Sequence, residues 1–128
     1  MTASPTRRSR ILIVEDQKDT ADSLRMLLEL VGYEVAVACT GPEGVEKAVR
    51  WRPDAVLCDI GLPGLDGYSV AQRLRRNPAT ANARLIAITA WGGEEDRRRG
   101  QEAGFDHHLV KPANPEHLLR LLATVETS

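Results

Sequence analysis

Short apolar runs alternate along this chain with longer segments in which apolar residues recur every three or four positions. The short runs predict β-strands, and the longer, amphipathic segments predict α-helices. Their repetition from end to end predicts βαβ units and a parallel sheet, which is the pattern of an α/β fold. Strands are expected at residues 11–14, 34–39, 55–58, 85–89 and 108–110.

Four of these five segments are continuous apolar runs, as expected for strands that are covered on both faces. The exception is the second strand, in which Ala36 separates Val35 from Val37. This pattern indicates a position nearer the edge of the sheet.

The first two helices are marked by signals at their ends. Gly32 stands where the first helix needs a C-terminal cap. Thr40, Pro42 and Glu43 supply the second helix with an N-cap, a first-turn proline and a glutamate three residues after the cap, and this helix is expected to run to about Arg50. Apolar positions are Ala21, Leu24, Leu27, Leu28 and Val31 in the first helix and Val45, Ala48 and Val49 in the second.

Three more helices are expected at about 68–76, at about 94–103 and from Pro115 onward, where Asn114 is the N-cap. The helix at 94–103 is almost wholly polar, and a helix with so little apolar surface is held weakly and can shift easily. Its Arg97–Arg99 run is interpreted as a solvated face. The apolar positions are Val70 and Leu74 in the third helix and Leu118, Leu119, Leu122 and Val125 in the last.

The composition is that of an ordinary globular protein of one domain. The chain has 128 residues, of which 42% are hydrophobic and 27% charged, with a formal net charge of −1, so nothing in it demands a nucleic-acid partner. A short basic cluster at residues 7–10 is typical of a solvated tail. We therefore expect a flexible tail at 1–9 and a single domain at 10–126.

Cysteine usage and hydropathy predict a cytoplasmic protein. Cys39 and Cys58 both lie in apolar runs, where a buried, reduced thiol is the usual state. Neither a membrane-spanning segment nor the hydrophobic segment of a signal peptide is present in the sequence. No disulfide and no membrane partner are expected.

Charged residues follow three of the predicted strands at the point where each strand ends. Glu15 and Asp16 follow the first strand, Asp59 follows the third, and Lys111 follows the fifth. Because the carboxyl ends of parallel strands meet at one edge of the sheet, we expect three acids and a lysine to form one site there.

The chemistry of this site points to a cation and a phosphoryl group. Three carboxylates within about 5 Å of one another repel strongly, so they stay ionised together only if a cation joins them. Mg²⁺ fits best, because it binds through one or two carboxylates and accepts phosphate oxygens as further ligands. Lys111 suits a phosphoryl oxygen, and Thr89 adds a hydroxyl donor at the end of the fourth strand. Asp59 could then act as the nucleophile that forms an aspartyl phosphate.

These residues resemble the motifs of a known family, the receiver domain of two-component response regulators. Glu15-Asp16 is similar to the acidic pair of that family, Asp59 to its phospho-accepting aspartate, and Gly61–Gly67 to the loop that follows. Thr89-Ala90 is similar to the switch hydroxyl and its neighbour, and Lys111-Pro112 to the lysine that precedes a cis-proline. The resemblance extends from about Arg10 to Val125.

The resemblance implies a flavodoxin-like, doubly wound fold. Its five parallel strands, counted along the chain, would lie in the order 2-1-3-4-5, with helices on both faces. It also implies Mg²⁺ held by Asp16, Asp59 and the backbone carbonyl of Gly61, with Glu15 acting mostly through a bound water. Mn²⁺ is a second ion that such a site accepts. Lys111 and the backbone amides after Asp59 would hold the phosphoryl oxygens.

The implied function is a signalling switch and not substrate turnover. A histidine kinase or a histidine phosphotransfer protein would present a phosphohistidine to Asp59. The face made by the fourth helix, the fifth strand and the fifth helix would then change and bind a downstream protein, without direct contact to nucleic acid. The sequence leaves open whether phosphorylation drives homodimer formation, and whether the domain stands alone or belongs to a hybrid histidine kinase.

His108 departs from the family pattern, because it stands where a tyrosine or phenylalanine usually swings inward on phosphorylation. Two interpretations stay open: His108 is a switch residue, or it is a partly exposed strand residue without that role. The adjacent His107 is expected at the surface.

Gly61 and Trp91 occupy positions that, in the family, influence how long the aspartyl phosphate lasts. Gly61 has no side chain to orient a water, and Trp91 could cover the phosphoryl group, so slow self-dephosphorylation is predicted. Trp91 could equally be an exposed loop aromatic that packs on the fourth helix.

Two other functions are alternatives. An aspartate-nucleophile phosphohydrolase of the haloacid-dehalogenase kind would need a second acid two residues after Asp59, where Gly61 stands. A degenerate receiver that binds partners without phosphorylation is disfavoured by the intact set of Asp16, Asp59, Thr89 and Lys111.

Overall fold

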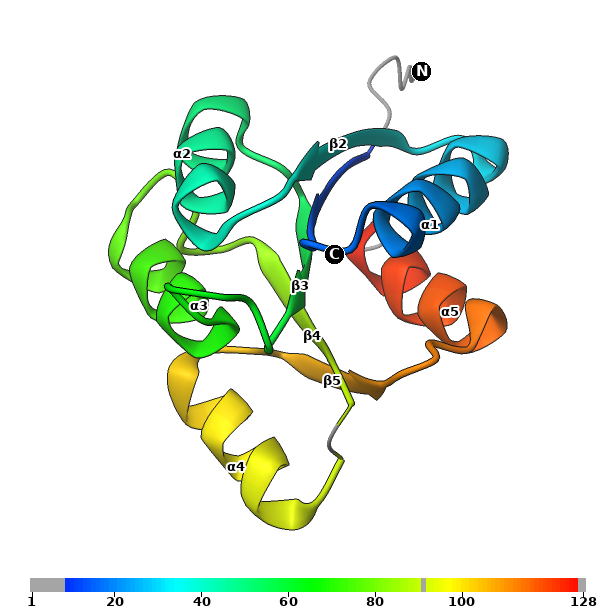
Figure 1. Ribbon diagram of the computed structural model, residues 1–128. Coiled ribbons are helices and arrows are strands. Elements are labelled where there is room, and N and C mark those ends of the chain that lie inside the picture. The colour runs from blue at the N-terminus through cyan, green and yellow to red at the C-terminus, as the bar shows by residue number, and fades with distance from the viewer. Residues whose placement is uncertain (1–8, 91, 127–128) are drawn as a thin grey trace.

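The computed structural model describes residues 9–90 and 92–126, which form a five-stranded parallel sheet between two layers of helices (Figure 1). The strands lie in the order β2-β1-β3-β4-β5, so the predicted doubly wound α/β fold is confirmed. The strands are β1 (Arg10–Val14), β2 (Glu34–Ala38), β3 (Ala55–Asp59), β4 (Arg84–Thr89) and β5 (His107–Val110). The helices are α1 (Lys18–Val31), α2 (Gly41–Trp51), α3 (Gly67–Arg76), α4 (Glu94–Ala103) and α5 (Pro115–Glu126).

Alternate residues of each central strand supply two separate cores, one on each face of the sheet. On one face, Ile11, Ile13 and Leu57 pack with buried residues of α1 and α5. On the other, Leu12 and Val56 pack with buried residues of α2, α3 and α4, in agreement with the helix layers in Figure 1. The continuous apolar runs in β1, β3 and β4 are thus explained by burial on both faces.

Side-chain caps position the helices as their sequence signals indicate. The Thr40 hydroxyl accepts from the backbone N–H of Glu43 at 3.2 Å, while the Glu43 carboxylate accepts from the N–H of Cys39 at 2.9 Å. Asn114 accepts from the N–H of His117 at 3.1 Å and so begins α5. Gly32 ends α1 with a left-handed φ of 112°.

Three expectations about burial were wrong. Val31 is 53% exposed, because the chain turns at Gly32 and the buried ring of Tyr33 fills the core beyond the helix end. Cys39 is exposed, since β2 ends one residue earlier, at Ala38, and Cys39 belongs to the turn before α2. The fifth strand is an edge strand and is not covered on both sides, so Val110 is exposed.

Some expectations fall outside the described part of the chain. Residues 1–8 of the expected tail and Trp91 are outside the described residues. The structure also describes no side chain at Val125. Among the described helices, none combines the length and apolar character needed to cross a membrane.

Candidate functional site

Asp59 is the last residue of β3, in the middle of the sheet, and the residue is 8% exposed. The backbone N–H of Gly61 donates to its Oδ1 at 3.0 Å. The loop that follows returns close beneath the strand end, because a Cβ at Gly67 would lie 2.7 Å from both the Asp59 carbonyl oxygen and Ile60 Cα. Only glycine fits that position without moving backbone, so the sequence of the loop fixes where Asp59 stands.

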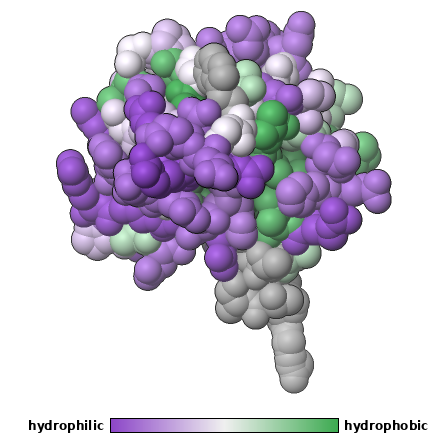
Figure 2. All heavy atoms as spheres, turned by 90° about the horizontal axis from the view of Figure 1, so that it is seen from below, coloured by the Kyte–Doolittle hydropathy of each residue, from purple (hydrophilic) through white to green (hydrophobic). Residues whose placement is uncertain are grey.

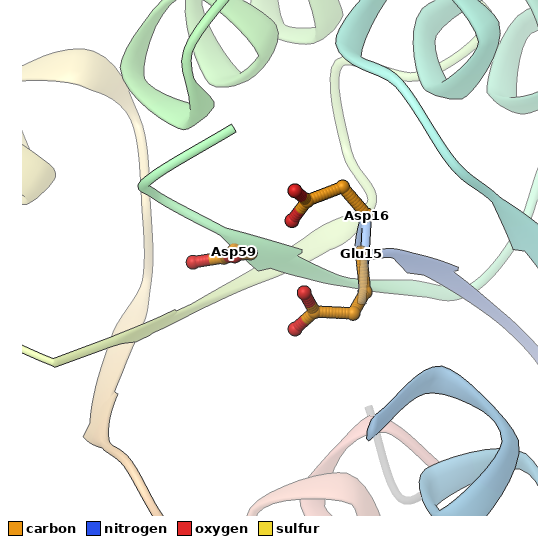
Figure 3. A group of neighbouring side chains, drawn as sticks. All are labelled: Glu15, Asp16 and Asp59. Atoms are coloured by element: carbon orange, nitrogen blue, oxygen red, sulfur yellow. The ribbon is translucent and has the colours of Figure 1, made fainter. Parts of the chain in front are cut away.

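The other two acids follow the neighbouring strand β1. Val14 pairs with Cys58 in the sheet register, so Glu15 and Asp16 emerge beside Asp59. One carboxylate oxygen from each of the three residues lies within 4.8 Å of the others (Figure 3). Glu15 is only 3% exposed and accepts from the backbone N–H of Gln17 at 3.1 Å, whereas Asp16 is exposed.

Lys111 joins this cluster from the loop after β5. Its Nζ lies 3.3 Å from Glu15 Oε1 and 3.3 Å from Asp59 Oδ2. The N–H of Lys111 donates to the Thr89 carbonyl at 2.7 Å, which fixes the start of the loop against the end of β4, and the Lys111–Pro112 peptide bond is cis. The lysine is therefore placed to neutralise two carboxylates at once.

The site shifts the protonation of its buried groups. Burial is the main cause that raises the pKa of Glu15 above its usual value, and the negative charge of Asp59 raises it further. The hydrogen bond from the Gln17 amide and the charge of Lys111 act to lower this pKa but do not outweigh burial. Burial acts to lower the pKa of Lys111, but Asp59 and Glu15 outweigh it and raise that pKa overall. Lys111 therefore stays charged at neutral pH, and Glu15 is the acid whose ionisation the fold disfavours.

Thr89 and Ala90 lie at the adjacent strand end. Thr89 is the last residue of β4 and is buried, while Ala90 is exposed in the loop that follows. Gly61 is exposed, and a Cβ added to it would lie 3.8 Å from Asp59 Oδ1, so the position has room for a side chain.

The two histidines of β5 are both partly buried. A Cβ added at Gly100 of α4 would lie 3.6 Å from His108 Nδ1, so His108 lies beside that helix, and it is not a member of the acidic cluster. His107 was expected at the surface, but it is half-buried and its Nε2 is enclosed. The burial comes from α4, because Gly100 and Gln101 of that helix line one cavity together with His107.

The donor set of the acidic cluster fits Mg²⁺. Three carboxylates converge, one of them exposed enough to leave room for water, and oxygen ligands of this kind suit a small hard ion. When bound, such an ion would offset the carboxylate charge and take phosphoryl oxygens as ligands.

The sequence as a whole matches one family. The model of the response regulator receiver domain matches residues 11–123. This chain belongs to the response regulator receiver family. Receiver domains are signalling domains, generally not enzymes, and they bind Mg²⁺ at an acidic site such as the one formed here by Glu15, Asp16 and Asp59.

Individual relatives agree with this family assignment. The DNA-binding dual master transcriptional regulator RpaA of Synechocystis is 39% identical over 110 residues, which are 86% of this chain and 46% of RpaA. The chain therefore spans less than half the length of that relative.

Two solved structures each align with 95% of this chain over 100% of their own length, at 34% sequence identity. A putative response regulator from Chloroflexus aurantiacus superposes with a TM-score of 0.89. The receiver domain of the sensor histidine kinase PA1611 from Pseudomonas aeruginosa, with a magnesium ion coordinated in its active-site cleft, superposes with a TM-score of 0.87.

Several contacts of this receiver domain are absent from the sequence prediction. Asp66 caps α3 by accepting from the N–H of Ser69 at 2.9 Å, which its place before the helix could have indicated. The Arg97–Arg99 run is exposed, as the sequence predicts, and Arg99 in addition lies over the ring of Tyr68. No local pattern predicts that contact, since the two residues are far apart in the chain.

Proposed function

We propose that this receiver domain accepts a phosphoryl group on Asp59 and reports it as a change of shape. The observation that supports this most directly is the cluster around Asp59: Lys111 Nζ at 3.3 Å on one side and the carboxylates of Glu15 and Asp16 on the other. In this proposal Asp16, Asp59, the Gly61 carbonyl and, mostly through water, Glu15 hold Mg²⁺. Mn²⁺ is expected to substitute for it.

The donor in this proposal is a phosphohistidine on a histidine kinase or a histidine phosphotransfer protein. A carboxylate oxygen of Asp59 forms a bond to phosphorus as the bond from phosphorus to the histidine nitrogen breaks, and that nitrogen keeps the electron pair. Lys111 and the backbone amides after Asp59 offset charge on the phosphoryl oxygens, which is where the protein contributes most in phosphoryl transfer. The domain for this activity is 10–126, with 1–9 as a tail, and we place it in the cytoplasm.

The readout involves Thr89, Ala90 and the face made by α4, β5 and α5. A charge-assisted hydrogen bond from Thr89 to the phosphoryl group is worth about 1.5–3 kcal/mol, whereas the inversion of a 1:99 population takes about 5.5 kcal/mol. Thr89 therefore acts together with Lys111 and the repositioned backbone after Thr89. His108, which lies beside α4, is the β5 residue that senses the change, and a downstream protein binds the altered face.

The same geometry supports slow loss of the phosphoryl group. Gly61 offers no side chain that could orient an attacking water beside Asp59 Oδ1. We expect Trp91, outside the described residues, to add cover. Release of phosphate within seconds from purified, phosphorylated protein would contradict this expectation.

The test is incubation of the whole chain with Mg²⁺ and acetyl phosphate, followed by intact-protein mass spectrometry, with Asp59→Asn as the control. One phosphoryl group per chain that persists and is lost in the control supports the proposal. Continuous release of phosphate with many turnovers would indicate a phosphohydrolase instead. No label on the unaltered chain would indicate a receiver that works without phosphorylation.

A further inference from the structure

Helix α4 is held to the domain mainly through its second half. Its two buried residues, Gly100 and Ala103, both lie there, and Phe105, just beyond its end, is buried in the core. In the first half only Asp96 is even half-buried, and the N-cap Gly93 has no side chain to bond the first turn. Seen from the side of α4, hydrophilic side chains gather over the helix and border a hydrophobic strip (Figure 2).

Arg75 of α3 fixes the C-terminal end of α4. Its Nε and Nη2 donate to the carbonyl of Gly104, the C-cap of α4, at 2.9 and 2.7 Å. Nη2 also pairs with Asp106 at 2.8 Å, and Nη1 donates to two carbonyls of the loop before β4. Gly104 has a φ of +120°, and a Cβ there would lie 2.7 Å from Arg75 Cγ. One guanidinium thus bonds this end of α4 to the starts of β4 and β5.

The middle of α4 contacts α3 through a cation–π pair. The Cζ atom of Arg99 lies 4.4 Å from the centroid of the Tyr68 ring. Tyr68 is the second residue of α3 and comes directly after the loop that leads from Asp59. The preceding residue, Arg98, pairs within the helix with Glu95 instead. Arg99 therefore links the middle of α4, one residue before the buried Gly100, to the segment that follows Asp59.

We propose that α4 is a lever that pivots at its clamped C-terminal end, and that Arg99 on Tyr68 is the latch that holds it in the unphosphorylated position. The lever itself is a property of the unphosphorylated fold, whereas its regulatory use rests on the proposed function. Residues that move after Thr89 would pull on the weakly held N-terminal end of α4. Rotation about Gly104 then lifts Arg99 from the ring of Tyr68 and leaves the Arg75 bonds intact.

The latch is tested on the unphosphorylated chain by amide hydrogen exchange of Arg98–Gly100, whose N–H groups bond within α4, and of Arg97, whose N–H bonds to the N-cap Gly93. Tyr68→Leu removes the ring but keeps an apolar side chain, and exchange should become about two- to fivefold faster. Tyr68→Phe keeps the ring and should exchange as the unaltered chain does. Arg99→Met should match Tyr68→Leu, and the double variant should be no faster than either, because both remove one interaction.

Some exchange results would overturn the latch or the pivot. Equal rates in the Leu and Phe variants, or additive effects in the double variant, overturn the latch. In the unaltered chain the amides of Gly104 and Phe105 should exchange more slowly than those of Arg97–Arg99, and the reverse order overturns the pivot.

The regulatory part is tested by titration with beryllium fluoride and Mg²⁺, a mimic of the phosphoryl group. Coupling is reciprocal, so Tyr68→Leu should lower the concentration for half-saturation by the same two- to fivefold. Faster exchange without tighter binding would overturn the role of the latch in switching. If the unaltered chain binds no beryllium fluoride and takes no label on Asp59, the proposed function fails, while the exchange rates still decide the latch.

Discussion

Lys111 Nζ lies 3.3 Å from Glu15 Oε1, and Glu15 is almost fully buried. The lysine expected to contact a phosphoryl group therefore already offsets the charge of a buried acid. Lys111 Nζ lies equally close, at 3.3 Å, to Asp59 Oδ2. A change to Lys111 or to Glu15 therefore alters the electrostatic balance at Asp59.

Glu15→Gln should make the metal-free protein more stable at pH values above the raised pKa of Glu15, and it should flatten the fall in stability with rising pH above about 4.5. The pKa of Glu15 is raised above 4.5 in the fold, so the folded state binds more protons than the unfolded state in this pH range. The stability from Glu15 is thus present below about 4.5 and is lost as the pH rises through the raised pKa. Urea unfolding with a chelator measures it.

The same variant should bind Mg²⁺ more weakly, because it removes one carboxylate from the cluster. A gain in stability on Mg²⁺ addition that equals that of the unaltered chain would contradict the assignment of Glu15 to the metal site.

Lys111→Met should lower the stability of the metal-free protein by about 1–3 kcal/mol, because Asp59 and Glu15 lose the cation that offsets them. The raised pKa of Lys111 means that its contribution is lost only as the pH rises beyond about 10.5. The variant should also bind Mg²⁺ more tightly, since a competing positive charge is gone. Calorimetric titration with Mg²⁺ checks this, and weaker binding would argue against direct competition.

Gly67→Ala should cost about 1–3 kcal/mol of stability, because the added Cβ meets the backbone of Asp59 and Ile60 at 2.7 Å. It should also slow labelling of Asp59, whose strand end must move. Gly61→Ala is the matched control in the same loop, since its nearest contact would be 3.8 Å away. Thermal unfolding and the rate of labelling by acetyl phosphate would compare the two, and equal losses would refute the argument from close approach.

Thr89→Ala should leave labelling of Asp59 largely intact but reduce the exchange change in α4 on phosphorylation. The alanine lacks the hydroxyl that is worth about 1.5–3 kcal/mol to the switched state. Thr89→Ser, which keeps the hydroxyl, should restore the response. A full response in the alanine variant would assign the switch to Lys111 and the backbone alone.

Most elements of the fold could be predicted from local pattern. Apolar runs and cap residues such as Thr40 and Asn114 act over a few residues, so each strand or helix end that the sequence predicts lies within one or two residues of its place in the structure. The convergence of Glu15, Asp16, Asp59 and Lys111 also followed, because the carboxyl ends of parallel strands meet at one edge.

By itself, the sequence determined which residues would meet, since strand ends and residue order are local properties of the chain. Only the tertiary structure decided how each one is surrounded. Glu15 is buried while the adjacent Asp16 is exposed, and Cys39 faces solvent although it follows an apolar run. The attachment of α4 through Arg75 and through Arg99 on Tyr68 joins residues that are distant in sequence. Burial, pKa and such contacts depend on the packing of several elements at once, which no local pattern contains.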